Sequence, residues 1–172
     1  MAGRRMAVRS SFIPCAAPPA SLGTSDAYIV TRARWGAPWG TPRQLTQHGS
    51  SDPKWSPDGR LIAFCAGGQL RVIAPDGTGE RVLVESAPNQ PQPAYPVWSN
   101  DSRFIYYKAY DRDRNSTIWS LPVTGGPPRL LVRFDDPARR SLRREFATDG
   151  VRFYFTVARE ESDIWTMEIL NR

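Results

Sequence analysis

The sequence predicts an all-β fold in which a four-stranded antiparallel unit recurs about three and a half times. The stretch Trp55-Ser56-Pro57-Asp58-Gly59 is typical of a tight turn, because proline presets the backbone while aspartate and glycine close it. Weaker copies follow at 98–107 and 146–155, which places the three aspartates 43 and then 48 residues apart. A repeat of this length is typical of a propeller blade, a sheet that buries its faces against neighbouring blades. We therefore expect an incomplete β-propeller.

The strand after the first turn is predicted to be buried on both faces. Ile62 and Phe64 point to one side of an extended strand, and the alternating residues point to the other. These alternating residues, Leu61, Ala63 and Cys65, are apolar as well. We therefore expect sheets on both sides of this strand, with Cys65 acting as a small buried apolar residue.

The chain divides into a tail, half a blade and three blades. The tail (1–25) combines arginines with prolines and lacks an uninterrupted apolar core, so we expect a disordered or non-native segment and not a secretory signal. The half blade (26–46) supplies two outer strands, and the blades span 51–85, 93–134 and 141–170. The last blade ends after its third strand, and a closed ring needs about four to eight blades. Either a longer parent protein supplies the remainder, which we prefer, or copies of the chain associate through open blade edges.

The repeated stretch resembles the TolB-type propeller repeat, which begins with the same Trp-Ser-Pro-Asp-Gly turn and an Ile-Ala-Phe strand (62–64). Its later Ile-Trp strands have counterparts at 118–121 and 164–167, whereas Asn100 and Ser102 depart from the repeat. This repeat occurs in periplasmic TolB, in prolyl-oligopeptidase and dipeptidyl-peptidase propellers, and at the C-terminus of some bacterial serine/threonine kinases. The resemblance implies a bacterial protein and a periplasmic location, and it implies the fold more strongly than any function.

Composition argues against nucleic-acid binding and against a membrane span. No apolar run is long enough to cross a bilayer, although hydrophobic residues make up 40% of the chain. The net charge is +6, and Arg4, Arg5 and Arg9 of the tail contribute half of it. The remaining basic residues are mostly scattered arginines, with Lys54 and Lys108 as the two lysines, whereas nucleic-acid binding needs a clustered face.

Motifs of catalysis and metal binding are missing from the sequence. His48 is the only histidine, and no Gly-x-Ser-x-Gly stretch provides a nucleophile. The segment 111–115 opens like a calcium loop, but Ser116 stands where glycine is needed and Pro122 where the bidentate glutamate is needed. We therefore predict no catalytic, cofactor-binding or metal-binding residues, no cofactor, and a chain that is not an enzyme.

Two groups of residues are candidates for binding a partner. Trp35 and Trp39 lie in the long loop of the half blade, where they either bind a partner or cover the loop backbone and the neighbouring blade. The second group is a basic cluster that could meet an acidic peptide or phosphate, namely Arg139, Arg140, Arg143 and Arg144. Nearby acids favour a solvated, salt-bridged loop for this cluster. The repeated turn residues are interpreted as structural, and they are Asp58, Gly59, Asp101, Asp149 and Gly150.

These observations favour a non-catalytic protein-interaction or sensing module with a protein or peptide partner. In such a module the blades form a scaffold, and loops at one end carry recognition. The alternative is an accessory C-terminal propeller portion of an enzyme, either a serine/threonine kinase sensor or a prolyl-oligopeptidase-type peptidase, separated from its catalytic domain. A kinase-like reading frame upstream of Met1 would favour that alternative.

Overall fold

The computed structural model describes residues 7–9, 25–47, 49–87, 90–111, 115–136 and 139–159, and all regular structure within them is β. The strands of the first half of the chain are β1 (Ala7–Arg9), β2 (Tyr28–Val30), β3 (Arg43–Gln44), β4 (Ser51–Trp55), β5 (Ile62–Ala66), β6 (Gln69–Ile73) and β7 (Arg81–Glu85). Those of the second half are β8 (Gln92–Trp98), β9 (Phe104–Tyr110), β10 (Ser116–Pro122), β11 (Arg129–Phe134), β12 (Arg139–Arg140), β13 (Phe146–Thr148), β14 (Phe153–Phe155) and β15 (Ala158–Arg159).

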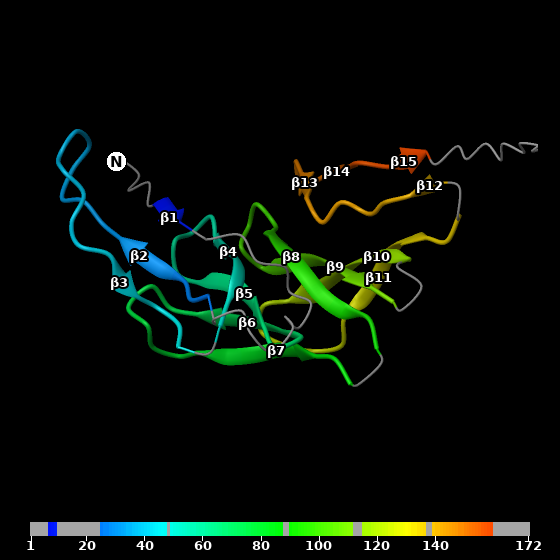
Figure 1. The fold of residues 1–172 in the computed structure, drawn as a ribbon, viewed down its shortest axis with the longest axis horizontal. Coiled ribbons are helices and arrows are strands. Elements are labelled where there is room, and N and C mark those ends of the chain that lie inside the picture. Colours follow the sequence, from blue (N-terminus) through cyan, green and yellow to red (C-terminus); the bar gives the residue numbers. More distant parts are fainter. Residues whose placement is uncertain are drawn as a thin grey trace, which may run out of the picture.

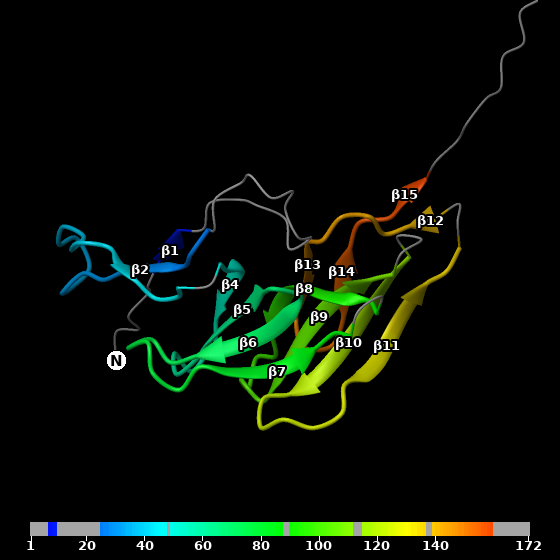
Figure 2. The same ribbon diagram turned by 60° about the horizontal axis from the view of Figure 1, so that its bottom comes forward.

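Two four-stranded antiparallel sheets form the centre of the molecule (Figures 1 and 2). Blade one has the order β4-β5-β6-β7, and blade two has the order β8-β9-β10-β11, so each sheet runs up and down in chain order. The strand β8 contacts β4, β5 and β6, which places the two sheets against each other. The predicted fold class, an incomplete all-β propeller, is confirmed.

The strand β5 is buried on both faces, as predicted. Ile62 and Phe64 are 0% and 1% exposed and pack toward the half blade. Ala63 and Cys65 are equally buried on the opposite face, toward blade two. The partners on the half-blade side are Ala27, Leu45 and Ile73, and those on the blade-two side include Trp98, Ile105, Tyr107 and Leu121. Burial of a side chain such as Ile62 contributes about 1.5–3 kcal/mol.

Both inner strands are interrupted at the same position of the repeat. The register of β4 shifts between Ser51 and Lys54, and that of β8 shifts between Ala94 and Val97. Asp52 and Tyr95 occupy these bulges with φ values of 54° and 51°. A proline follows each of them, and since proline has no N–H, the hydrogen-bond ladder must break there.

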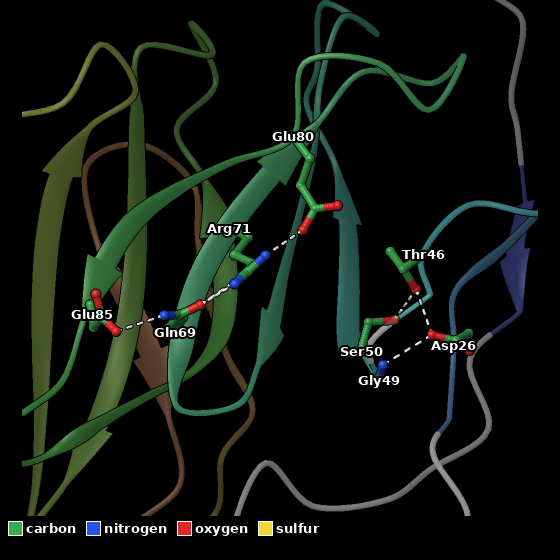
Figure 3. Close-up of polar contacts among 8 residues, drawn as sticks. All are labelled: Asp26, Thr46, Gly49, Ser50, Gln69, Arg71, Glu80 and Glu85. Carbon is green, nitrogen blue, oxygen red and sulfur yellow. Dashed lines mark hydrogen bonds and ion pairs between the residues drawn. The ribbon is translucent and has the colours of Figure 1, made fainter. Parts of the chain in front are cut away.

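A network around one carboxylate fastens the half blade to blade one (Figure 3). Asp26 accepts hydrogen bonds from Thr46 Oγ1 at 3.2 Å, from the Gly49 N–H at 3.1 Å and from Gln44 Nε2 at 3.0 Å. The Thr46 oxygen also accepts the Ala27 N–H at 2.9 Å. The end of β3 and the segment that enters β4 are therefore held to the residues that precede β2.

The outer part of blade one is polar on the face toward the half blade. Arg71 lies opposite Phe64 in the ladder and pairs with Glu80 at 2.6 Å (Figure 3). Arg71 Nε also donates to Gln69 Oε1 at 2.8 Å, and Gln69 donates to Glu85 at 2.8 Å. Polar side chains thus continue this face where the apolar cluster around Phe64 ends.

The strand β1 lies within the segment 1–25, for which the sequence predicted no structure. It pairs antiparallel with β2, with Ala7 opposite Val30. The edge of β2 that does not pair with β3 offers unpaired N–H and C=O groups, and such an edge recruits an additional strand.

Within the described residues the third blade is represented by one antiparallel hairpin, in which 139–148 runs against 153–159. Its ladder is interrupted and forms two parts, β13-β14 and β12-β15, with Phe146 opposite Phe155 and Arg140 opposite Ala158. Aromatic contacts hold the first of them to blade two, with Phe153 5.0 Å from Tyr106 between ring centroids and Phe155 4.8 Å from Phe134. The third strand predicted at 164–167 lies outside the described residues.

Each repeated turn is closed by its aspartate. Asp58 Oδ1 accepts the Ser56 hydroxyl at 2.6 Å and the Arg60 N–H at 3.1 Å, and these hydrogen bonds lower the pKa of its carboxyl group. Asp101 makes the same pair of contacts in blade two. Asp149 instead accepts the N–H groups of Val151 and Arg152 at 2.8 and 2.6 Å.

The two residues that depart from the repeat in blade two connect the turns of different blades. Ser102 takes the place of Gly59, has a φ of 60°, and accepts the Asp58 N–H at 3.1 Å. Asn100 takes the place of Pro57 and donates to the Asp149 carbonyl oxygen at 3.0 Å. Neither proline nor glycine has a side chain that can make these hydrogen bonds.

We predict that Asp58→Ala lowers the free energy of unfolding by about 1 kcal/mol, because it removes the acceptor that closes the first turn. The loss should be present at pH 7 and shrink as pH falls through the lowered pKa of Asp58, since protonation removes the negative charge that strengthens these hydrogen bonds in the wild type. Urea denaturation at several pH values measures both effects. Asp58→Asn keeps a side-chain oxygen and serves as the control, and an equal loss in the two variants would contradict the assignment.

Candidate interaction site

The loop between β2 and β3, residues 31–42, projects from the end of the molecule in both ribbon views (Figures 1 and 2). We call it the tryptophan loop. Trp35 is 80% exposed and Trp39 is 44% exposed, so neither ring is buried against a blade. The Gly40 N–H donates to the Thr31 carbonyl oxygen at 2.8 Å and closes the base of the loop.

The two tryptophan rings hold a guanidinium group between them. The Cζ atom of Arg32 lies 4.2 Å from the ring centroid of Trp35 and 4.6 Å from that of Trp39. Both distances are in the range of cation–π contacts, in which the flat guanidinium face meets the electron-rich ring. The sequence analysis named the tryptophans but missed Arg32, whose only signal was its place three residues before Trp35.

The base of the loop is fixed to blade one by Arg43. Its guanidinium nitrogens donate to the carbonyl oxygens of Pro75 at 2.6 Å and Asp76 at 3.2 Å, in the turn between β6 and β7. With the Asp26 network, this contact gives the loop a rigid base, while its outer side chains remain exposed.

The four arginines of the predicted basic cluster are held in different ways. Arg139 and Arg140 lie on β12. Arg139 pairs with Asp136 at 3.9 Å, and the side chains of these two partners are each more than half exposed. Arg143 and Arg144 precede β13, and the carbonyl oxygen of Arg143 accepts hydrogen bonds from blade two. Arg144 lies close enough to influence Asp52, whose pKa is raised mainly by burial and is opposed by the charge of Arg144.

A buried lysine joins blade two to the third unit. Lys108 is fully buried, and its Nζ donates to Ser141 Oγ at 2.7 Å and to the Arg143 carbonyl oxygen at 2.6 Å. Tyr110 donates to the same carbonyl oxygen at 3.0 Å. Burial lowers the pKa of Lys108 to about 8, against a smaller opposing effect of the Glu145 charge. The sequence analysis missed this residue, although a lysine at the repeat position of Cys65 was a usable signal.

A shallow groove of about 250 Å³ lies between blade two and the third unit. Its walls combine aromatic, aliphatic and a few polar side chains, namely Phe104, Tyr106, Ser120, Arg129, Leu131, Thr148, Gly150, Val151 and Phe153. Val151 at its rim is 88% exposed. The groove is open and mainly apolar, and no titratable pair within it is arranged for catalysis among the described residues.

Two other features considered in the sequence are the calcium-loop-like segment 111–115 and His48, and the structure describes only the ends of the first. Asp111 accepts the Asn115 N–H at 2.8 Å and the Asn115 side-chain amide at 3.1 Å, whereas 112–114 lie outside the described residues. His48 also lies outside them. In the described part of the chain, no group of three or more His, Cys, Asp or Glu side chains is arranged to hold a metal ion. The same part contains no helix long and apolar enough to span a membrane.

Comparison with known proteins supports the fold and leaves the function open. No family model matches the chain. Coronin-7 from Bos taurus is 28% identical over 123 residues, which cover 67% of this chain and 13% of coronin-7. A TolB-type protein structure from Agrobacterium tumefaciens matches with a TM-score of 0.54 and 22% identity, covering 64% of this chain and 42% of its own. An oligogalacturonate lyase in complex with manganese matches with a TM-score of 0.52 and 12% identity, covering 65% and 34%.

The chain therefore spans well under two thirds of the proteins it resembles. The resemblance to TolB-type propeller blades that the repeat predicted is confirmed at the level of the fold, which is that of a partial β-propeller.

We predict that the wild type gains stability relative to Lys108→Met as pH rises from about 8 to 10. In the unfolded chain the lysine keeps its proton up to its ordinary pKa of 10.5, whereas the buried lysine releases it near 8. The unfolded state thus binds more protons in this window, so rising pH favours the folded state. Unfolding free energies measured in urea across the window test this.

Two tyrosines also change the pH dependence of stability, but at higher pH than Lys108. Burial raises the pKa of Tyr107 and Tyr110 to about 12, so their effect on stability begins only above their ordinary value of 10 and is common to both proteins. If the difference in unfolding free energy between the wild type and Lys108→Met stays constant from pH 8 to 10, the lowered pKa assigned to Lys108 is contradicted.

Proposed function

We propose that this chain is a non-catalytic protein-interaction module and that the tryptophan loop is its contact surface. The proposal is carried by one observation: two exposed indole rings and the guanidinium they hold lie together on a loop with a fixed base. Tryptophan and arginine are the residues most enriched at the energetic centres of protein interfaces. An exposed tryptophan is also a large apolar surface that a partner can remove from water.

The blades serve as the scaffold in this proposal. Their apolar residues are used for packing between sheets, and their repeated aspartates are used for closing turns. The basic cluster is a weaker candidate surface, since Arg139 is paired with Asp136 and the backbone of Arg143 is engaged by Lys108.

The second role, an accessory propeller of an enzyme, is compatible with the same contact surface. The structures with similar folds include a lyase, so the fold by itself favours neither role. In an enzyme, the tryptophan loop would bind a catalytic domain of the same protein. A kinase or peptidase domain encoded in the same reading frame would identify that case.

The double variant Trp35→Ala/Trp39→Ala is expected to lose its protein partner while keeping its melting temperature, because both side chains are largely outside the core. Affinity capture with the immobilised chain, followed by binding measurements on each identified protein, tests this. Val157→Ala removes an exposed apolar side chain from the third unit and is the matched control. Equal binding of one defined partner by the wild type and the double variant would contradict the proposal.

A further inference from the structure

Within the part of the chain that the structure describes, no ion pair neutralises the charge of Arg32. None of the ion pairs formed among the described residues involves Arg32 or its neighbour Arg34. The Arg32 Cζ lies within 4.6 Å of the ring centroids of Trp35 and Trp39, and the N–H groups of its guanidinium are the donors that it can offer to an acceptor. A guanidinium edge matches a carboxylate with two parallel hydrogen bonds.

The segment that contains the tryptophan loop carries arginines and no acidic residue. From Ala27 to Ser51 the sequence contains three arginines and no aspartate or glutamate. The nearest preceding acid, Asp26, already accepts hydrogen bonds from Gln44, Thr46 and Gly49. The loop itself therefore does not repel an acidic ligand.

The apolar part of the surface is exposed, whereas the side chain of Arg32 is partly buried. Trp35 is 80% exposed, and Pro38 and Trp39 beside it are also exposed. Indole rings provide flat surfaces on which proline and aliphatic side chains stack. A ligand that fits this loop thus combines a carboxylate with a neighbouring apolar residue.

The neighbouring turn of blade one limits the size of an anionic ligand. Arg43 connects the base of the loop to that turn, and the exposed acid Asp76 lies on it. A long polyanion, such as a nucleic-acid strand or an anionic membrane, would bring further negative charges against this carboxylate. A short acidic peptide places one or two carboxylates at Arg32 and Arg34 and avoids this repulsion.

We propose that the tryptophan loop binds a short acidic peptide segment in which glutamate or aspartate alternates with proline or aliphatic residues. The carboxylate pairs with Arg32, and the apolar residues stack on Trp35 and Trp39. This inference rests on the proposed function and names the chemistry of the partner.

The test uses the full chain and a fluorescein-labelled peptide that repeats Glu-Pro-Leu, with a counterpart in which glutamine replaces glutamate. Fluorescence anisotropy is expected to show binding of the acidic peptide and at least about tenfold weaker binding of the glutamine peptide. Arg32→Gln and Trp35→Ala/Trp39→Ala should each weaken binding by about tenfold or more. Arg60→Gln removes an 86% exposed guanidinium from another turn and should leave the affinity within about twofold.

Three results would overturn the inference. They are equal affinity for the two peptides, unchanged affinity of Arg32→Gln, and binding of single-stranded oligothymidine or of phosphatidylserine–phosphatidylcholine vesicles without binding of the acidic peptide. If a protein partner is lost by the double tryptophan variant while the acidic peptide does not bind the wild type, the proposed function stands and this inference fails.

Discussion

Burial of both faces of β5 is the constraint on which the molecule depends. Ile62 and Phe64 need the half blade, and Ala63 and Cys65 need blade two, so a single blade without neighbours would leave both apolar faces in water. The half blade is consequently an essential cover, and its attachment through Asp26 is part of the core arrangement. The same logic explains why the last sheet, which has no further blade beside it among the described residues, leaves Tyr154 exposed.

The contacts between units change in character along the chain. Apolar side chains fill the interface between the half blade and blade one and the interface between blades one and two. At the next junction, aromatic pairs share the interface with the buried amino group of Lys108 and its oxygen acceptors. The tryptophan loop belongs to the unit at the opposite end, where hydrogen bonds from Arg43 and to Asp26 position it without covering its outer surface.

The sequence predicted those features that depend on local chemistry. The turn at Asp58 and the two-faced strand at 62–66 follow from proline, aspartate, glycine and strict alternation, and these act within a few residues. The placement of Arg32 between two rings depends on how a long loop folds back, and no short-range pattern encodes it. The bulge at Asp52 was not predicted, because an alternating pattern indicates an unbroken strand. The proline that follows Asp52 was the signal for it.

The hydrogen bonds made by Asn100 and Ser102 give a structural role to residues that depart from the repeat consensus. Restoring the consensus proline and glycine there would improve each turn as an isolated element, yet it would delete the two hydrogen bonds that run from turn to turn across three units. In a modular protein, cooperativity depends on such coupling between neighbours more than on the quality of each module. Departures from a consensus can therefore be the residues that make separate modules melt as one body.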